Sequence, residues 1–135
     1  NQLMQFYKKA NIESEIFNFT NQIIDYYFKA NLVITRSGAS VLGELINVTL
    51  PFISIPLPSS ADNHQYKNAK FYEKKGLGYF LDEKNIKNQL YGVINSIFND
   101  KSLIKKIISN QRQYSDKNIF SNLNAELEKI LNDKN

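Results

Sequence analysis

Residues 36–68 contain several polar side chains that are suited to binding a ligand. A turn of small residues, RSGAS at 36–40, follows an apolar run and precedes an amphipathic segment that carries one acid, Glu44. The turn lacks bulk, and the N–H groups at the start of the following helix point out of it, so an anion can approach the backbone closely. These residue types therefore favour the binding of a phosphate at this turn.

A second polar group follows the next apolar run along the chain. The segment PFISI (51–55) leads into a loop rich in Pro and Ser, after which Asp62, His64, Gln65 and Asn68 open a polar helix. Gln65 and Asn68 are three residues apart, so they share a helix face and can converge on one ligand. Ligands of parallel sheets bind beyond the carboxyl ends of the strands. We therefore expect the two polar groups to meet at one edge.

The apolar periodicity predicts helices alternating with strands. This order gives a right-handed, Rossmann-like doubly wound parallel α/β sheet, and we expect residues 1–135 to form one domain. Thr20 or Asn21 is expected to cap the second helix, and Asp62 to cap the fourth with Gln65 as its capping-box partner. Gly76 is expected to end that fourth helix. The predicted helices span about 2–10, 21–30, 39–48, 62–75, 83–98, 101–113 and 117–132, and the predicted strands 13–19, 31–35, 52–55 and 77–81.

The composition excludes several classes of protein. Hydrophobic residues make up 42% of the chain, which is typical of a folded domain and not of a disordered one. There are no cysteines, so disulfide scaffolds and cysteine-based zinc sites are excluded. No apolar run is long enough to span a bilayer. The net charge of +4 comes from lysines scattered among acids, and it is compatible with either nucleic acid or an anionic membrane surface.

The segments ITRSGASVLGE, LPFISIPLP and ADNHQYKNA, with the spacing between them, resemble the carboxyl-terminal, donor-binding half of the MurG family. Members of this family are UDP-N-acetylglucosamine transferases that convert lipid I to lipid II in peptidoglycan synthesis, and each half of their GT-B fold is Rossmann-like. The resemblance begins near residue 17. It implies an inverting glycosyltransferase in which this chain is the carboxyl-terminal UDP-sugar-binding domain. The amino-terminal acceptor domain and the glycine-rich loop of the family are then absent.

The same resemblance implies a set of partners. UDP-N-acetylglucosamine is expected as the donor substrate, with no metal and no further cofactor. Lipid I is expected to bind through the missing amino-terminal domain, on the cytoplasmic face of the inner membrane, where the protein would be peripheral. The catalytic base is expected from that missing half, so we expect no catalytic residue here. The chain alone should bind UDP or the donor weakly and lack transferase activity.

The family's donor site is carried over residue by residue. Uracil is contacted largely through backbone groups, so the side chains at that place are loosely constrained. A carboxylate can accept hydrogen bonds from both hydroxyls of a ribose diol. By position, the matches are Phe19 and Thr20 for the uracil, Arg36, Ser37, Gly38 and Ala39 for the sugar and diphosphate, Glu44 for the ribose, and His64, Gln65 and Asn68 for the N-acetylglucosamine.

Each assignment has a simpler structural alternative. Glu44 can be a solvated acid stabilised by the helix dipole, and Gln65 a capping-box partner only. Asn68 and His64 can be ordinary surface groups. Arg36 can pair with a nearby acid or with strand carbonyls.

Other functions also remain open. One is another GT-B sugar-nucleotide enzyme, such as a UDP-N-acetylglucosamine 2-epimerase or a glycolipid synthase. A second is a separate donor-binding subunit that needs a partner chain for catalysis. A third is a nucleic-acid binder, which would show steeply salt-dependent binding; the scattered lysines disfavour it.

Overall fold

The structure is a computed structural model that describes residues 2–115. Helices and strands alternate as expected between residues 23 and 99, whereas the predicted helix at 117–132 lies outside the described residues. None of the described helices is long and apolar enough to cross a bilayer. In chain order the elements are α1 (Gln2–Lys9), α2 (Ile23–Lys29), β1 (Val33–Thr35), α3 (Ala39–Asn47), β2 (Phe52–Ser54), the 3-10 helix η1 (Ala61–Asn63), α4 (His64–Lys74), β3 (Tyr79–Phe80), the 3-10 helix η2 (Glu83–Asn85), α5 (Ile86–Asn99) and α6 (Lys101–Tyr114).

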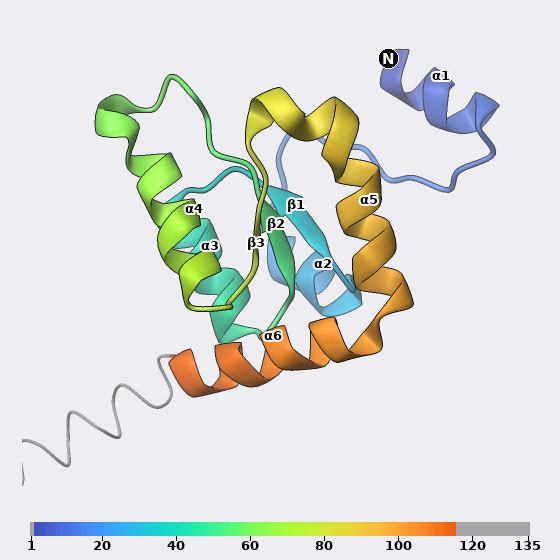
Figure 1. The fold of residues 1–135 in the computed structure, drawn as a ribbon. Coiled ribbons are helices and arrows are strands. Elements are labelled where there is room, and N and C mark those ends of the chain that lie inside the picture. Colours follow the sequence, from blue (N-terminus) through green and yellow to red (C-terminus); the bar gives the residue numbers. More distant parts are fainter. Residues whose placement is uncertain (1, 116–135) are drawn as a thin grey trace, which may run out of the picture.

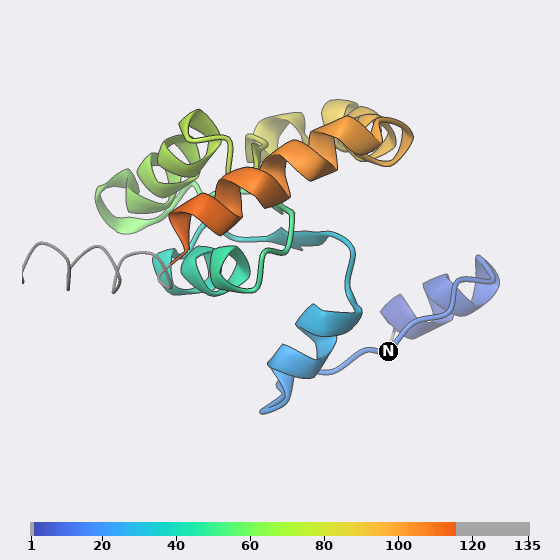
Figure 2. The same ribbon diagram turned by 90° about the horizontal axis from the view of Figure 1, so that it is seen from below.

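The three strands form one parallel sheet in the order β1-β2-β3. Val33 pairs with Phe52, and Ile53 pairs with Tyr79, so β2 has a neighbour on each side. Figure 1 shows α3 and α4 on one side of this sheet and α5 on the other, and the second view agrees (Figure 2). The expected parallel α/β architecture, with helices on both faces, is confirmed.

Strand β2 divides the hydrophobic core into two clusters, one on each face of the sheet, because successive side chains of a strand point to opposite faces. Phe52 packs with Leu42 and Leu45 of α3, whereas Ile53 packs with a cluster that includes Ile97 of α5. A Cβ atom at Gly78 would overlap the fully buried Phe52 ring, so glycine is required there for β3 to lie against β2. One face of the sheet is therefore covered by the crossover helices α3 and α4, and the other by α5, which follows β3.

Helix α6 crosses one end of the sheet (Figure 1). Its Gln111 side chain is fully buried, and Nε2 donates to the carbonyl oxygens of Leu50 at 3.2 Å and Leu77 at 2.7 Å. These two residues precede β2 and β3, so α6 lies at the amino ends of the strands. The carboxyl ends of the strands lie at the opposite side of the domain.

The prediction of a strand at 13–19 is wrong. That segment has no regular structure, and the described sheet has three strands instead of four. Its alternation of apolar and polar residues is weak, with acids at Glu13 and Glu15, and no strand within residues 2–115 lies beside it to accept its backbone hydrogen bonds. Phe19 is consequently 81% exposed, and α1, which precedes the segment, buries none of its residues.

We predict that Gln111→Ala lowers the free energy of unfolding by about 2–4 kcal/mol. The substitution leaves two buried carbonyl oxygens without this donor and opens a space at the amino ends of the strands. Gln89→Ala, the same truncation at an exposed position of α5, should change stability by less than about 0.5 kcal/mol. Urea denaturation followed by circular dichroism measures both. Equal stability of the two variants would contradict the role given to Gln111.

Candidate functional site

The segments that follow the three strands lie together at one edge of the sheet, where the carboxyl ends of the strands are (Figure 1). Residues 36–38 follow β1, residues 55–60 follow β2, and Leu81 and Asp82 follow β3. Helices α3, α4 and α5 begin beyond these segments. Because the strands are parallel, the expected meeting of the two polar groups at one edge is confirmed for the turn at 36–38 and the start of α4.

The turn at 36–38 leaves the start of α3 open. Gly38 is the N-cap residue, and among the described residues no side chain caps the first N–H groups of α3. A Cβ atom at Gly38 would meet no atom within 4 Å, so this backbone is accessible from outside. Ser37 is fully buried beside it, and its hydroxyl has no hydrogen-bond partner within the described residues. An uncapped helix start with an orphan hydroxyl alongside can accept an anion.

Arg36 connects the three strand ends. Its Nη1 donates to the carbonyl oxygen of Pro56 at 3.3 Å, and its Nη2 lies 2.9 Å from Oε1 of Glu83. The simpler role expected for Arg36, pairing with an acid and a carbonyl group, is therefore present. The two charged side chains are 48% and 35% exposed, and pairs this exposed contribute about 1 kcal/mol or less to stability. Arg36 can exchange this partner for a ligand phosphate at little cost.

Two amide side chains hold the start of α4 against the other loops. Asn68 donates from Nδ2 to the carbonyl oxygen of Ser37 at 3.2 Å. Gln65 accepts at Oε1 from the backbone N–H of Leu57 at 3.0 Å. Gln65 is thus not the capping-box partner predicted from the sequence, because its side chain bonds to the loop after β2. These bonds tie the turn after β1, the loop after β2 and α4 together.

The predicted cap of α4 is also wrong. Asp62 lies inside η1 with φ +47°, and the N-cap is Asn63 with φ +56° and no capping hydrogen bond from its side chain. Asp and Asn tolerate this left-handed backbone better than most residues, which lets the loop enter α4 through a tight turn. His64 donates from Nδ1 to the carbonyl oxygen of Ala61 at 2.6 Å, so its ring is fixed by that turn.

Glu44 is exposed on α3 and lies beside α2. The hydroxyl of Tyr27 donates to Glu44 Oε2 at 3.3 Å. Partial burial raises the pKa of Tyr27, and the negative charge of Glu44 and the hydrogen bond to it raise that pKa further. The phenol therefore stays protonated, and the Glu44 carboxylate has further acceptor positions for a ligand.

Phe19 and Thr20 are not joined to this edge by a contact in the described residues. The hydroxyl of Thr20 accepts from the backbone N–H of Gln22 at 3.0 Å, just before α2, in place of the predicted cap. Their role beside a uracil stays a prediction.

Sequence reasoning missed two partners in this region. Glu83 follows β3, and its position after the third strand end was the signal that could have placed it near Arg36. The contact of the Tyr27 hydroxyl with Glu44 could not be predicted, because it joins two helices whose relative position no local pattern gives.

We predict that Asn68→Ala lowers the free energy of unfolding by about 1 kcal/mol, because a partly buried hydrogen bond between α4 and the turn is lost. Asn68→Asp should lose at least as much, since a carboxylate cannot donate to the Ser37 carbonyl oxygen. Asn88→Ala, on the exposed surface of α5, is the matched control. Urea midpoints that are the same for Asn68→Ala and Asn88→Ala would mean that the bond to Ser37 does not hold the edge together.

Known proteins resemble this chain in sequence. A protein of Pelagibacter ubique (strain HTCC1062), named UDP-N-acetylglucosamine--N-acetylmuramyl-(pentapeptide) pyrophosphoryl-undecaprenol N-acetylglucosamine transferase, is 38% identical over 132 residues. The match covers 96% of this chain and 36% of that protein. A protein of the same name from Rickettsia prowazekii (strain Madrid E) is 47% identical over 87 residues, which are 64% of this chain and 23% of the relative. This chain thus spans about a third or less of the length of these relatives.

A solved structure has the same fold. The crystal structure of Acinetobacter baumannii MurG matches with a TM-score of 0.69 and 23% identity, covering 84% of this chain and 34% of that one. The sequence model of one protein family, the glycosyltransferase family 28 C-terminal domain, matches residues 1–127 of this chain. The resemblance found in the sequence is therefore confirmed. With this match over nearly the whole chain, the protein belongs to the glycosyltransferase family 28 C-terminal domain family.

Proposed function

We propose that this chain is the donor-binding half of an inverting transferase that moves N-acetylglucosamine from UDP-N-acetylglucosamine to lipid I in peptidoglycan synthesis. The names of the relatives support this activity. One observation carries the proposal: the uncapped start of α3 lies beside the start of α4 at the carboxyl ends of the strands. Hydrogen bonds of Arg36, Gln65 and Asn68 hold the loops of this edge together.

The spacing of the edge fits a nucleotide-sugar. The diphosphate binds at the start of α3, where N–H groups and the positive end of the helix dipole face it. Glu44 lies six residues beyond Gly38, about 9 Å along the helix, and accepts from the ribose hydroxyls. The start of α4, with His64, Gln65 and Asn68, contacts the N-acetylglucosamine. Phe19 and Thr20 border the uracil through their backbone.

The contribution of this half to catalysis is to hold the leaving group. Inversion at the anomeric carbon needs a base for the acceptor hydroxyl, alignment of the reactants and stabilisation of the departing UDP diphosphate. The N–H groups of α3 stabilise the diphosphate as its charge grows, and Arg36 adds a positive charge once it leaves Glu83. The base and the lipid I site are assigned to the other half of the transferase. The whole transferase is placed at the cytoplasmic face of the inner membrane.

We predict that Glu44→Ala weakens UDP binding by about tenfold or more, because hydrogen bonds to a charged acceptor are lost. Isothermal titration calorimetry with UDP and with 2′-deoxy-UDP, on wild type and variant, isolates the ribose contact. The variant should lose less affinity for 2′-deoxy-UDP than for UDP, because one of the two hydroxyls is already missing.

Two variants serve as controls for this experiment. Glu13→Ala removes an exposed acid far along the chain from α3 and should leave UDP affinity unchanged. Tyr27→Phe keeps the Glu44 carboxylate and removes only its internal donor, so affinity should change by less than about threefold. An equal loss for UDP and 2′-deoxy-UDP in Glu44→Ala would remove Glu44 from the ribose site.

A further inference from the structure

An ion pair crosses the candidate site from the first strand to the third. Arg36 follows β1 and Glu83 follows β3, and β2 lies between these two strands in the sheet. The Nη2 atom of Arg36 lies 2.9 Å from Oε1 of Glu83, and its Nη1 atom donates to the carbonyl oxygen of Pro56, in the loop after β2, at 3.3 Å. The pair therefore lies across the carboxyl ends of all three strands, beside the open start of α3.

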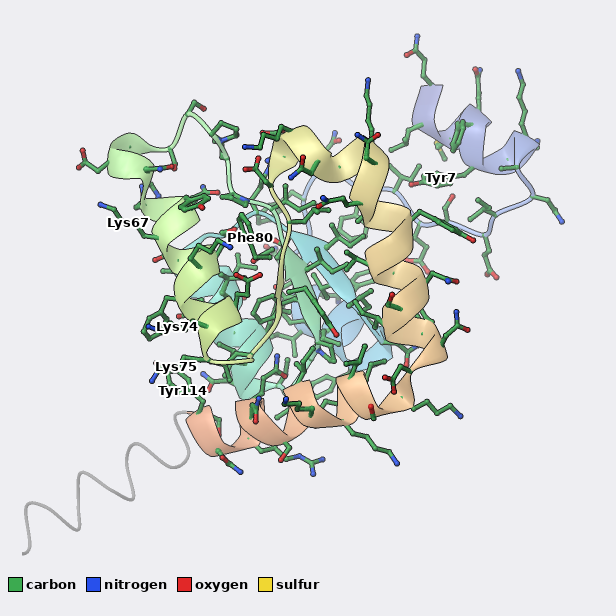
Figure 3. The ribbon with its side chains drawn as sticks, in the orientation of Figure 1. Tyr7, Lys67, Lys74, Lys75, Phe80 and Tyr114 are labelled. Carbon is green, nitrogen blue, oxygen red and sulfur yellow. The ribbon has the colours of Figure 1, made fainter. Side chains whose placement is uncertain are left out.

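Arg36 is the one basic residue in the segments that directly follow the three strands, at 36–38, 55–60 and 81–83. The lysines that Figure 3 labels on α4 lie on the outer side of that helix, away from the sheet: Lys67, Lys74 and Lys75. An anion at the start of α3 thus has one guanidinium group close to it in these segments. In the described structure the carboxylate of Glu83 already pairs with that group.

Glu83 can release Arg36 without losing all of its own stabilisation. It lies in the first turn of η2, which runs directly into α5, and the helix dipole favours a carboxylate at a helix start. The backbone of η2 is held by Asp82, whose Oδ1 atom accepts from the N–H of Lys84 at 3.2 Å. Because both partners of the ion pair are partly exposed, water replaces a lost partner at low cost. The pair can therefore open when a ligand binds and close when it leaves.

We propose that Glu83 is a positioning residue that holds Arg36 beside the diphosphate site and takes it back when UDP leaves. The carboxylate competes with the diphosphate for the same guanidinium group and also repels it, and the repulsion grows with the charge of the ligand. UDP ends in a free phosphate whose second ionisation lies near about pH 6, so at neutral pH it carries about one more negative charge than the donor's diphosphate. Glu83 therefore weakens the binding of the product more than that of the donor.

This inference rests on the proposed function and extends it to the release of the product. In a transferase the departing UDP has to leave before the next donor binds. A carboxylate that pairs again with Arg36 favours this release, and it keeps the guanidinium group near the site while the site is empty. The loop after β2 contributes through Pro56, because its carbonyl oxygen retains Nη1 of Arg36 while Nη2 changes its partner.

The test is isothermal titration calorimetry of the 135-residue chain with UDP and with UDP-N-acetylglucosamine, at low salt, where charges are least screened. Glu83→Gln should bind UDP about three- to fivefold more tightly, which is the effect of removing one exposed ion pair. Its affinity for the donor should rise by about twofold or less, because the donor carries less charge. Glu83→Asp keeps the carboxylate and should stay within about twofold of wild type for both ligands.

The matched control is Glu73→Gln on α4. Glu73 pairs with Lys70 at 2.8 Å, with a similar exposure of both side chains, and lies nine residues beyond His64, about 13 Å along the helix from the candidate site. This variant has the same change in net charge as Glu83→Gln and should leave both affinities unchanged.

A double-mutant cycle shows whether Glu83 acts through Arg36. On the background of Arg36→Gln, the further change Glu83→Gln should raise UDP affinity by less than about twofold, because the guanidinium group that it would release is absent.

A spectroscopic measurement follows the exchange of partners directly. The chain has two arginines, Arg36 and Arg112, so the Nε–Hε signals of the 15N-labelled protein can be assigned with the variant Arg112→Lys. Glu83→Gln should shift the Arg36 signal in the absence of ligand, and UDP should shift this signal in wild type.

The outcomes separate this inference from the proposed function. If UDP binds but its affinity is unchanged in Glu83→Gln, rises equally with and without Arg36, or rises no more than the affinity for the donor, the inference is overturned and the proposed function stands. If neither wild type nor any variant binds UDP or the donor, the proposed function falls and this inference falls with it.

Discussion

The parallel pairing of β2 with a strand on each side is the constraint on which the described structure depends. All three residues of β2 are buried, with Phe52 facing α3 and Ile53 facing α5. A strand buried on both faces must have both faces covered, and here α3 and α4 cover one face and α5 covers the other. The same pairing sends three strand ends, and the segments after them, to one edge. The location of the candidate site is thus a consequence of the packing of one short strand.

The edge itself is held by polar bonds that cross between loops. Arg36 reaches the loop after β2 and the acid after β3, Gln65 reaches the same loop from α4, and Asn68 reaches the turn after β1. None of these side chains is an isolated surface group. They fix the start of α4 near the open start of α3, so the candidate site is ordered without a ligand, an arrangement that reduces the ordering cost of binding.

Much of this architecture follows from local pattern. Continuous apolar runs gave the positions of β1 and β2, and the small-residue turn at 36–40 gave the start of α3. Contacts distant in sequence were not predictable in this way. The cap of α4 depends on a left-handed turn at Asp62 and Asn63, and the pairing of Arg36 with Glu83 depends on sheet order. At residues 13–19 the local pattern predicted a strand that the structure lacks. A strand needs a neighbouring strand for its backbone hydrogen bonds, and the local pattern does not show whether one is present.

The most direct test of this account is nuclear magnetic resonance of the 15N-labelled chain during titration with UDP-N-acetylglucosamine. The account predicts that the largest amide shift changes fall on residues 37–40 and on the start of α4 around Gln65 and Asn68, with little change on α6. At saturating donor, shift changes concentrated on α6 or α5, with the amides of Gly38 and Ala39 unmoved, would contradict it.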